Sequence, residues 1–175
     1  MTTIVGVDPG ISGALALYDV CARKMINVCD LPVVGSPAMV DADGLAWLLT
    51  QWAPDEAIIE DVHAMKGQGV SSMFRFGKGA GIIVGVLAGL RIPRRFVSPQ
   101  RWKSHYGLGK EKENSRRLAI ERFPTFAEQL RRKHDHQRAE AMLIAHYGAV
   151  KTLPTTEHVH DQLEQGAGRS PDQPA

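Results

Sequence analysis

A carboxylate inside an apolar strand constrains this sequence most. Residues 57–62 read AIIEDV, a pattern typical of a strand buried on both faces of a sheet. Because an unpaired carboxylate is costly to bury, we interpret Glu60 as a functional residue. Its neighbour Asp61 points to the opposite face of the strand. A shift of one residue in register would exchange their roles, so both remain candidates.

The other apolar runs predict how this strand is surrounded. Three strands in succession, followed by alternating helices and strands, predict an α/β fold. We expect a mixed five-stranded sheet, a three-strand meander plus parallel strands, with helices on both faces. The expected strands cover residues 3–7, 13–18, 25–29, 57–62 and 94–97, and the expected helices cover residues 43–52, 73–90, 99–103, 110–122 and 135–150. Asp43 is the expected cap of the first helix, and Ser71 or Ser72 that of the second.

Length and cysteine usage limit the class of protein. The chain has 175 residues, enough for one domain with a proper core. We assign residues 1–152 to that domain and expect the polar, Gly- and Pro-rich residues 153–175 to be disordered. Cys21 and Cys29 form no CxxC pair, so neither zinc nor a disulfide framework is indicated. No signal peptide is recognisable, and we expect a cytoplasmic protein whose apolar residues 79–90 form a buried helix, not a membrane span.

Positive charge is concentrated in the second half of the chain. The net charge of +2 is mild, but residues 91–138 contain 14 Lys and Arg against 5 Asp and Glu. Such a stretch is typical of a surface that attracts a phosphate backbone. A solvated helix face has the same composition, so composition alone leaves both interpretations open.

Three carboxylates are candidates for a metal site. Asp8 ends the first strand, Glu60 lies in the fourth, and Glu140 lies on the last helix in an apolar context. Converging carboxylates repel one another unless a cation neutralises them, and oxygen ligands suit Mg²⁺ or Mn²⁺. Two such ions about 4 Å apart activate water and stabilise the leaving oxygen in phosphodiester cleavage. A turn role for Asp8 and a solvated position for Glu140 are the alternatives.

A fourth site residue is expected at the start of the last helix. The candidates are Asp135, His136 and Gln137. His136 precedes Glu140 by four residues, so it shares its helix face. Asp135 is rotated away from that face and suits a cap. We therefore favour His136 as ligand or general base and keep Asp135 as the rival.

Taken together, these segments resemble the RuvC-like Holliday junction resolvases of the RNase H and retroviral-integrase superfamily, and the last segment is closer to phage-type and organellar members. The resemblance covers roughly residues 3–150 and rests on VGVDPG from Val5, IIEDV from Ile58, a Gly-rich helix with Phe76, Ala80 and Gly81, VSPxxWK from Val97, and DHxRAEAMLIA from Asp135.

The resemblance implies an RNase H-like fold and a Mg²⁺-dependent endodeoxyribonuclease. Such an enzyme resolves branched DNA in recombination and repair by paired symmetric nicks, and Mn²⁺ can substitute for Mg²⁺. The acidic site positions carry over to Asp8, Glu60 and Glu140, and the fourth to His136. Relatives have an aromatic wedge in the loop after the strand-borne Glu, where this chain offers only His63 or Met65.

The resemblance also implies a DNA surface and a homodimer. The expected DNA-binding residues are His63, Met65, Lys66, Arg75, Lys78, Arg101, Lys103, Lys110, Lys112 and Arg116, with Arg117 beside them. Glycines recur every fourth residue at positions 77, 81, 85 and 89. They form a smooth stripe that either packs a dimer partner or packs on the chain's own sheet.

Three other functions compete with this hypothesis. The sequence DPGISG also resembles the first phosphate loop of actin-like and sugar-kinase ATPases, but 175 residues leave no room for their second domain. A junction-binding module without catalysis is another. A nuclease of the same fold that cuts RNA–DNA hybrids is the third.

Overall fold

The computed structural model describes residues 1–62, 69–109 and 111–152. The wedge candidates His63 and Met65, the basic residues Lys66 and Lys110, and the expected tail 153–175 lie outside the described residues. Their roles therefore remain predictions.

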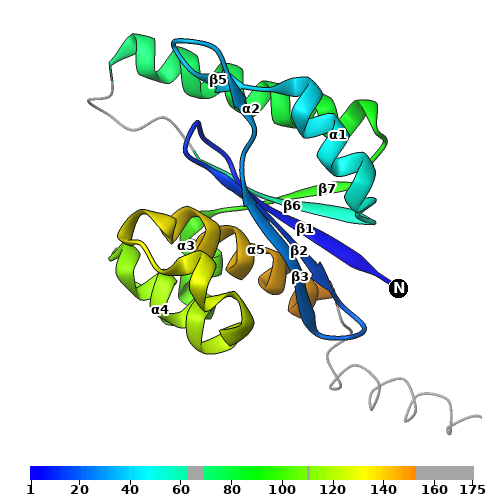
Figure 1. The fold of residues 1–175 in the computed structure, drawn as a ribbon, viewed down its shortest axis with the longest axis vertical. Coiled ribbons are helices and arrows are strands. Elements are labelled where there is room, and N and C mark those ends of the chain that lie inside the picture. The colour runs from blue at the N-terminus through cyan, green and yellow to red at the C-terminus, as the bar shows by residue number, and fades with distance from the viewer. Residues whose placement is uncertain (63–68, 110, 153–175) are drawn as a thin grey trace, which may run out of the picture.

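A five-stranded mixed sheet forms the centre of the molecule, in the order β3-β2-β1-β6-β7 (Figure 1). The meander pairs its strands antiparallel, and β1, β6 and β7 run parallel. This confirms the predicted fold class. The strands are β1 (Thr3–Asp8), β2 (Ala14–Asp19), β3 (Lys24–Asp30), β6 (Glu56–Glu60) and β7 (Arg94–Val97).

Helices cover both faces of this sheet (Figure 1). One layer contains α1 (Ala42–Trp52) and α2 (Val70–Gly89), and the other contains α3 (Pro99–His105), α4 (Lys112–Arg122) and α5 (His136–Thr152). Two 3₁₀ turns, Pro124–Leu130 and Lys133–Asp135, connect α4 to α5. A small hairpin of β4 (Val33–Val34) and β5 (Met39–Val40) was not predicted, because two-residue strands are too short to show a period.

The predicted helix caps are wrong. Asp41, not Asp43, caps α1, because its side chain accepts hydrogen bonds from the backbone N–H groups of Asp43 and Gly44, both at 3.1 Å. This places Asp43 inside the first turn. The helix α2 begins at Val70 with Gly69 as its N-cap and no side-chain cap, so Ser71 and Ser72 lie within the helix.

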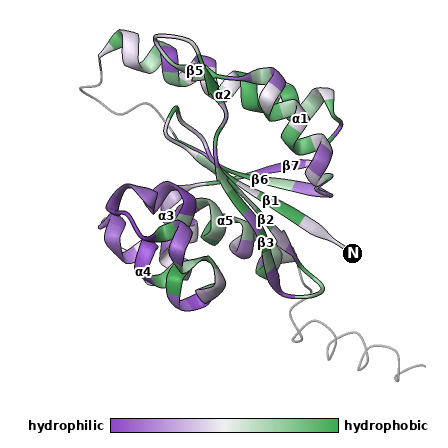
Figure 2. Cartoon of the chain, viewed as in Figure 1, coloured by the Kyte–Doolittle hydropathy of each residue, from purple (hydrophilic) through white to green (hydrophobic). Residues whose placement is uncertain are grey.

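Two apolar cores lie on either side of the sheet. Ile4 and Ile58 face α5, whereas Val5, Val7 and Ile59 face α1 and α2. The strands β1 and β6 are therefore buried on both faces, as the AIIEDV pattern predicted. Figure 2 shows that α3 and α4 are mostly hydrophilic, in contrast to the central strands.

Close packing of α5 on β1 depends on Gly6. A Cβ at this position would lie 2.3 Å from the carbonyl oxygen of Ala141 on α5. Only glycine allows this approach. Because Asp8 follows Gly6 on the same face of β1, the contact brings the start of α5 over the end of the strand that carries Asp8.

The helix α2 is much more exposed than predicted. Its length and composition would suit a membrane span, and only 17% of its apolar window is buried. Ile83 and Leu87 join the core on this side of the sheet, and Gly79 lies against Val40 of β5. A Cβ at Gly77, Gly81, Gly85 or Gly89 would meet no described atom within 4 Å. The stripe therefore does not pack on the chain's own sheet, and that alternative is wrong.

Candidate active site

Asp8 and Glu60 end two neighbouring parallel strands. The last registered pair of β1 and β6 is Val7 with Ile59, so the two carboxylates follow one step later at the same edge of the sheet. Both lie on the side that faces α5, because alternate residues share a face. Glu60 is buried, with 7% of its surface exposed. Asp61 lies beyond the strand and is half-buried, which answers the question of register in favour of Glu60.

Glu140 reaches the same region from the second turn of α5. Its side chain is buried, and its Oε1 accepts hydrogen bonds from Lys103 Nζ at 3.0 Å and from Ser115 Oγ at 3.1 Å. Lys103 belongs to α3 and Ser115 to α4. Two helices from the basic half of the chain therefore hold the third carboxylate in place.

The helix α3 also holds Glu60. The fully buried indole of Trp102 donates a hydrogen bond from Nε1 to Glu60 Oε1 at 2.9 Å. The ammonium group of Lys103 lies 5.0 Å from the centre of the same indole ring, a cation–π distance. The two consecutive residues Trp102 and Lys103 thus position Glu60 and Glu140, respectively.

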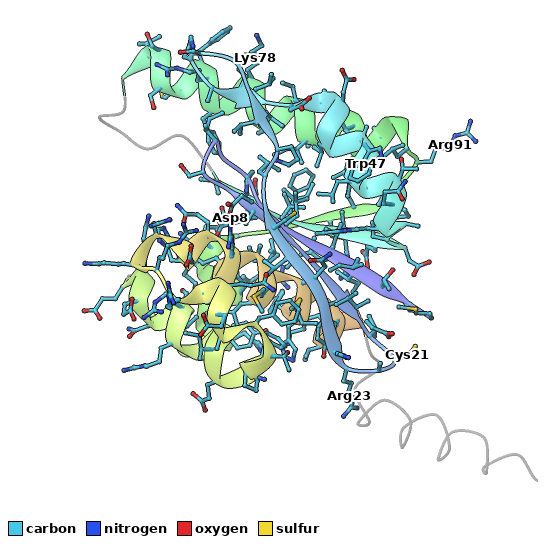
Figure 3. All side chains as sticks on the ribbon, in the orientation of Figure 1. Asp8, Cys21, Arg23, Trp47, Lys78 and Arg91 are labelled. Carbon is cyan, nitrogen blue, oxygen red and sulfur yellow. The ribbon has the colours of Figure 1, made fainter. Side chains whose placement is uncertain are left out.

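The carboxylates influence one another electrostatically. Burial raises the pKa of Asp8 well above its ordinary value, and the negative charges of Glu60 and Glu140 raise it further. Lys103 and Lys112 oppose this rise in pKa. Burial also raises the pKa of Glu60, although the hydrogen bond from Trp102 lowers it. Such a perturbed carboxylate cluster is typical of a functional site. Figure 3 shows Asp8 between the sheet and the layer of α3 and α4.

The donor chemistry fits a hard divalent cation, but the side chains are not gathered around one. Among the described residues, no group of three His, Cys, Asp or Glu lies close enough to form a ready-made metal site. Glu140 is instead bonded to Lys103 and Ser115, and Glu60 to Trp102. A cation between the carboxylates would relieve their repulsion and compete with the ammonium of Lys103.

Asp135 and His136 have different environments. The carboxylate of Asp135 is buried and accepts hydrogen bonds from the backbone N–H (2.7 Å) and guanidinium (2.9 Å) of Arg132. Burial alone would raise the pKa of Asp135, but these bonds and the charge of Arg132 bring it below its usual value. His136 begins α5, and its Nε2 is buried without a hydrogen-bond partner among the described residues. Asp135 is thus already bonded to Arg132, whereas Nε2 of His136 has no hydrogen-bond partner among the described residues.

The predicted DNA-binding residues are distributed over both layers. Lys103 and Lys112 lie near the carboxylates, and Arg101 is exposed on α3. Arg75 and Lys78 lie on α2, in the opposite layer from α3 and α4 (Figure 3). Arg116 is held by Glu113 and by the carbonyl oxygen of Leu130 at 2.7 Å. Its guanidinium is therefore largely used within the fold.

Sequence reasoning missed two site residues. Trp102 was part of the VSPxxWK motif without an assigned role, and Ser115 was not singled out. Both contacts join residues far apart in the chain. The available signal for Ser115 was a small polar residue on a basic helix, which is too common to indicate a buried contact.

Comparison with solved structures identifies proteins with a similar fold. RuvC from Thermus thermophilus in complex with a Holliday junction substrate aligns with 15% identity and a TM-score of 0.64, covering 89% of this chain and 98% of that one. The fowlpox virus Holliday junction resolvase aligns with 17% identity and a TM-score of 0.54, covering 87% and 99%. The chain has the fold of the RuvC-type resolvases.

A third solved structure agrees with this fold. The yeast mitochondrial Holliday junction resolvase aligns with 12% identity and a TM-score of 0.54, over 94% of this chain and 86% of that one. No protein-family model and no curated protein matches the sequence. The RuvC-type fold, including its RNase H-like sheet, is therefore recognised through the structure.

Proposed function

We propose that this protein is a metal-dependent, structure-selective endodeoxyribonuclease that cuts four-way DNA junctions by paired symmetric nicks. The observation that carries the proposal is the convergence of Asp8, Glu60 and Glu140 from two strand ends and one helix of a RuvC-type fold. Fold alone does not imply function. The proposal is supported by the fact that these three carboxylates are also the ones that the RuvC-like motifs indicated.

Mg²⁺ or Mn²⁺ would be held by Asp8, Glu60, Glu140 and His136. When bound, the metal supplies an activated water and stabilises the leaving oxygen. The support for His136 is its partnerless Nε2, one helical turn before Glu140. Asp135 is a poorer ligand because Arg132 already holds it.

Lys103 and Lys112 would contact the phosphate at the cut. Both carry positive charge close enough to the carboxylates to lower the pKa of Asp8. The ammonium of Lys103 would exchange Glu140 for a phosphate oxygen when DNA and metal bind. Arg101, also on α3, would extend this surface, and such phosphate contacts position DNA without reading its bases.

We further propose a homodimer in which α2 contacts the partner. An apolar helix with a smooth outer glycine stripe and little burial is typical of an interface. Paired nicks require two active sites, and a dimer supplies them.

Two observations favour a second function. The contact between Lys103 and Glu140, and the lack of a gathered metal group among the described residues, would suit a junction-binding module without catalysis.

A cleavage assay separates these possibilities. It compares a synthetic four-way junction with a linear duplex and an RNA–DNA hybrid of matched sequence, each with Mg²⁺ or with EDTA. We expect paired nicks in the junction alone, and only with metal. Tight junction binding without cutting would favour the module, and cutting mainly of the hybrid would keep the fold but contradict the substrate.

A further inference from the structure

An open cleft of about 320 Å³ lies on the α5 side of the sheet, next to its edge strand β7. Its lining includes Arg95 and Val97 of β7, Arg101 of α3, and Tyr147 and Lys151 of α5. The strand β7 is at the edge of the sheet, and α3 and α5 belong to the same helical layer (Figure 1).

The cleft is cationic. Arg95 pairs with Glu56 through two hydrogen bonds, of which Nη2 to Oε2 measures 2.9 Å. Arg101 and Lys151 are exposed. Their side chains make no hydrogen bond or ion pair with the rest of the described chain. The positive field of Lys151 extends to the end of α3, where burial lowers the pKa of His105 and Lys151 lowers it further. Glu56 offsets the charge of Arg95, so the positive charges of Arg101 and Lys151 remain uncompensated.

The walls of the cleft are fixed by close packing. Gly148 lies so near β6 that a Cβ there would be 2.4 Å from Ile58 Cγ1. Tyr147 is buried, and its ring centre lies 5.3 Å from that of His105 in an edge-on arrangement. A ligand would therefore meet a preformed site, which lowers the cost of binding.

The cleft begins beside the candidate active site and extends away from it. Val97 pairs with Glu60 across β6 and β7. Arg101 directly precedes Trp102 and Lys103, which hold the carboxylates. Lys151 follows Glu140 by eleven residues on the same helix, or about 16 Å along its axis. At about 3.4 Å per base step along one strand, this distance corresponds to about five steps.

We infer that this cleft is a second phosphate-binding subsite, which takes a backbone phosphate of the bound DNA arm up to about five nucleotides from the cut. The inference rests on the proposed nuclease function, because the carboxylates define where the cut lies. Arg101 and Lys151 bind the phosphate, and Arg95 contributes its charge. The subsite sets the direction in which the arm leaves the active site.

The test combines a double variant with modified DNA. Arg101→Gln with Lys151→Gln is compared with Arg91→Gln, whose side chain points outward in a different part of the molecule (Figure 3). We expect the double variant to lower the slope of log affinity against log salt by about one to two, and the control to leave it unchanged. Single neutral methylphosphonates about five positions from the cut should weaken binding by the wild type but not by the double variant.

The outcomes distinguish the subsite from the nuclease itself. Junction cleavage with an unchanged salt slope, and no interference at those positions, overturns the subsite and leaves the nuclease intact. No junction binding by the wild-type protein overturns the proposed function as well. Inorganic phosphate could instead raise the melting temperature of the wild type but not of the double variant, while the methylphosphonates leave DNA binding unchanged. That result would assign the cleft to a free anion and overturn the DNA subsite.

Discussion

Asp8 shows why a site residue can lower the stability of the free protein. Its carboxylate is held near Glu60 and Glu140, and both burial and these neighbours raise its pKa. The same negative charges would attract a divalent cation, so the repulsion among the carboxylates favours metal binding. Without a metal, the hydrogen bonds from Trp102 to Glu60 and from Lys103 to Glu140 stabilise the cluster.

Asp8→Asn should stabilise the protein in EDTA. An acid whose pKa is raised by folding holds its proton more tightly in the folded chain. The free energy of unfolding therefore falls as pH rises from the unfolded pKa of Asp through the folded one. A tenfold difference in proton affinity between the folded and unfolded chains corresponds to about 1.4 kcal/mol, or about 3–6 °C for a domain of this size. Thermal melts should show a higher melting temperature for the variant near neutral pH and a smaller difference in acid.

The same melts contain their own controls. Asp43→Asn, at an exposed position on α1, should leave the melting temperature unchanged. Mn²⁺ should raise the melting temperature of the wild type but not that of Asp8→Asn. Identical melts for wild type and Asp8→Asn at every pH would show that Asp8 is not in a repulsive cluster.

His136 and Asp135 should differ in what they contribute. His136→Ala is expected to lower junction cleavage by about 100-fold or more with little change in melting temperature, because its Nε2 has no partner to lose among the described residues. Asp135→Asn weakens the bonds to Arg132 and should lower stability by about 1–3 kcal/mol with a smaller loss of cleavage. Cleavage rates and chemical denaturation of both variants check this. A larger activity loss in the Asp135 variant would make Asp135 the fourth site residue.

At the scale of elements, α3 is a short helix with a large role. In two consecutive residues it supplies the indole that holds Glu60 and the ammonium that holds Glu140. The helix α5 is fixed equally tightly, because Gly6 on β1 and Gly148 on α5 allow close contact at both ends of the interface. The site is thus built on rigid elements, which is what a positioned carboxylate cluster requires.

Replacing Trp102 should test this role of α3. An isosteric benzothienyl analogue keeps the shape of the buried ring but lacks the N–H that donates to Glu60. We expect a loss of about 10- to 100-fold in metal affinity or cleavage rate, with the melting temperature nearly unchanged. Calorimetric titration with Mn²⁺ gives a readout independent of cleavage. Unchanged affinity and rate would show that the indole only fills space.

The sequence could predict the elements better than their contacts. The apolar pattern around Glu60 indicated a doubly buried strand, but Glu60 and Asp61 could not be separated because one residue of register decides between them. The glycine spacing in α2 indicated close packing without saying against what. The bond from Trp102 to Glu60 spans 42 residues, and such a contact depends on the fold rather than on local pattern.

At the scale of the whole molecule, the two layers differ in what they leave exposed. The layer of α3 and α4 is hydrophilic and basic, whereas α2 in the other layer exposes apolar and glycine positions (Figure 2). The proposed DNA surface around the carboxylates therefore lies on one side of the molecule and the proposed dimer surface of α2 on the other. A dimer through α2 would leave both carboxylate clusters accessible.

Gly81→Glu should convert a dimer into a monomer. A side chain at Gly81 meets no described atom of its own chain within 4 Å, and leaving glycine favours the helix by about 0.5–1 kcal/mol. The fold should therefore survive while the buried charge blocks the partner. Light scattering should give twice the 19.2 kDa chain mass for the wild type and the chain mass for the variant. Gln51→Glu, an exposed change on α1, should remain dimeric.

Two results would contradict this interface. A wild-type protein of 19.2 kDa across micromolar concentrations would exclude the dimer under those conditions. A Gly81→Glu variant that stays dimeric would place the interface elsewhere than α2.

The most direct test of the whole account is to measure junction binding and junction cleavage together for Asp8→Asn and Glu60→Gln. Asp43→Asn and Glu121→Gln, both at exposed positions, serve as matched controls. The account predicts that the site variants bind a four-way junction as tightly as the wild type but cut it at least about 1,000-fold more slowly, a loss of about 4 kcal/mol in transition-state stabilisation. Undiminished cutting by either site variant would contradict it.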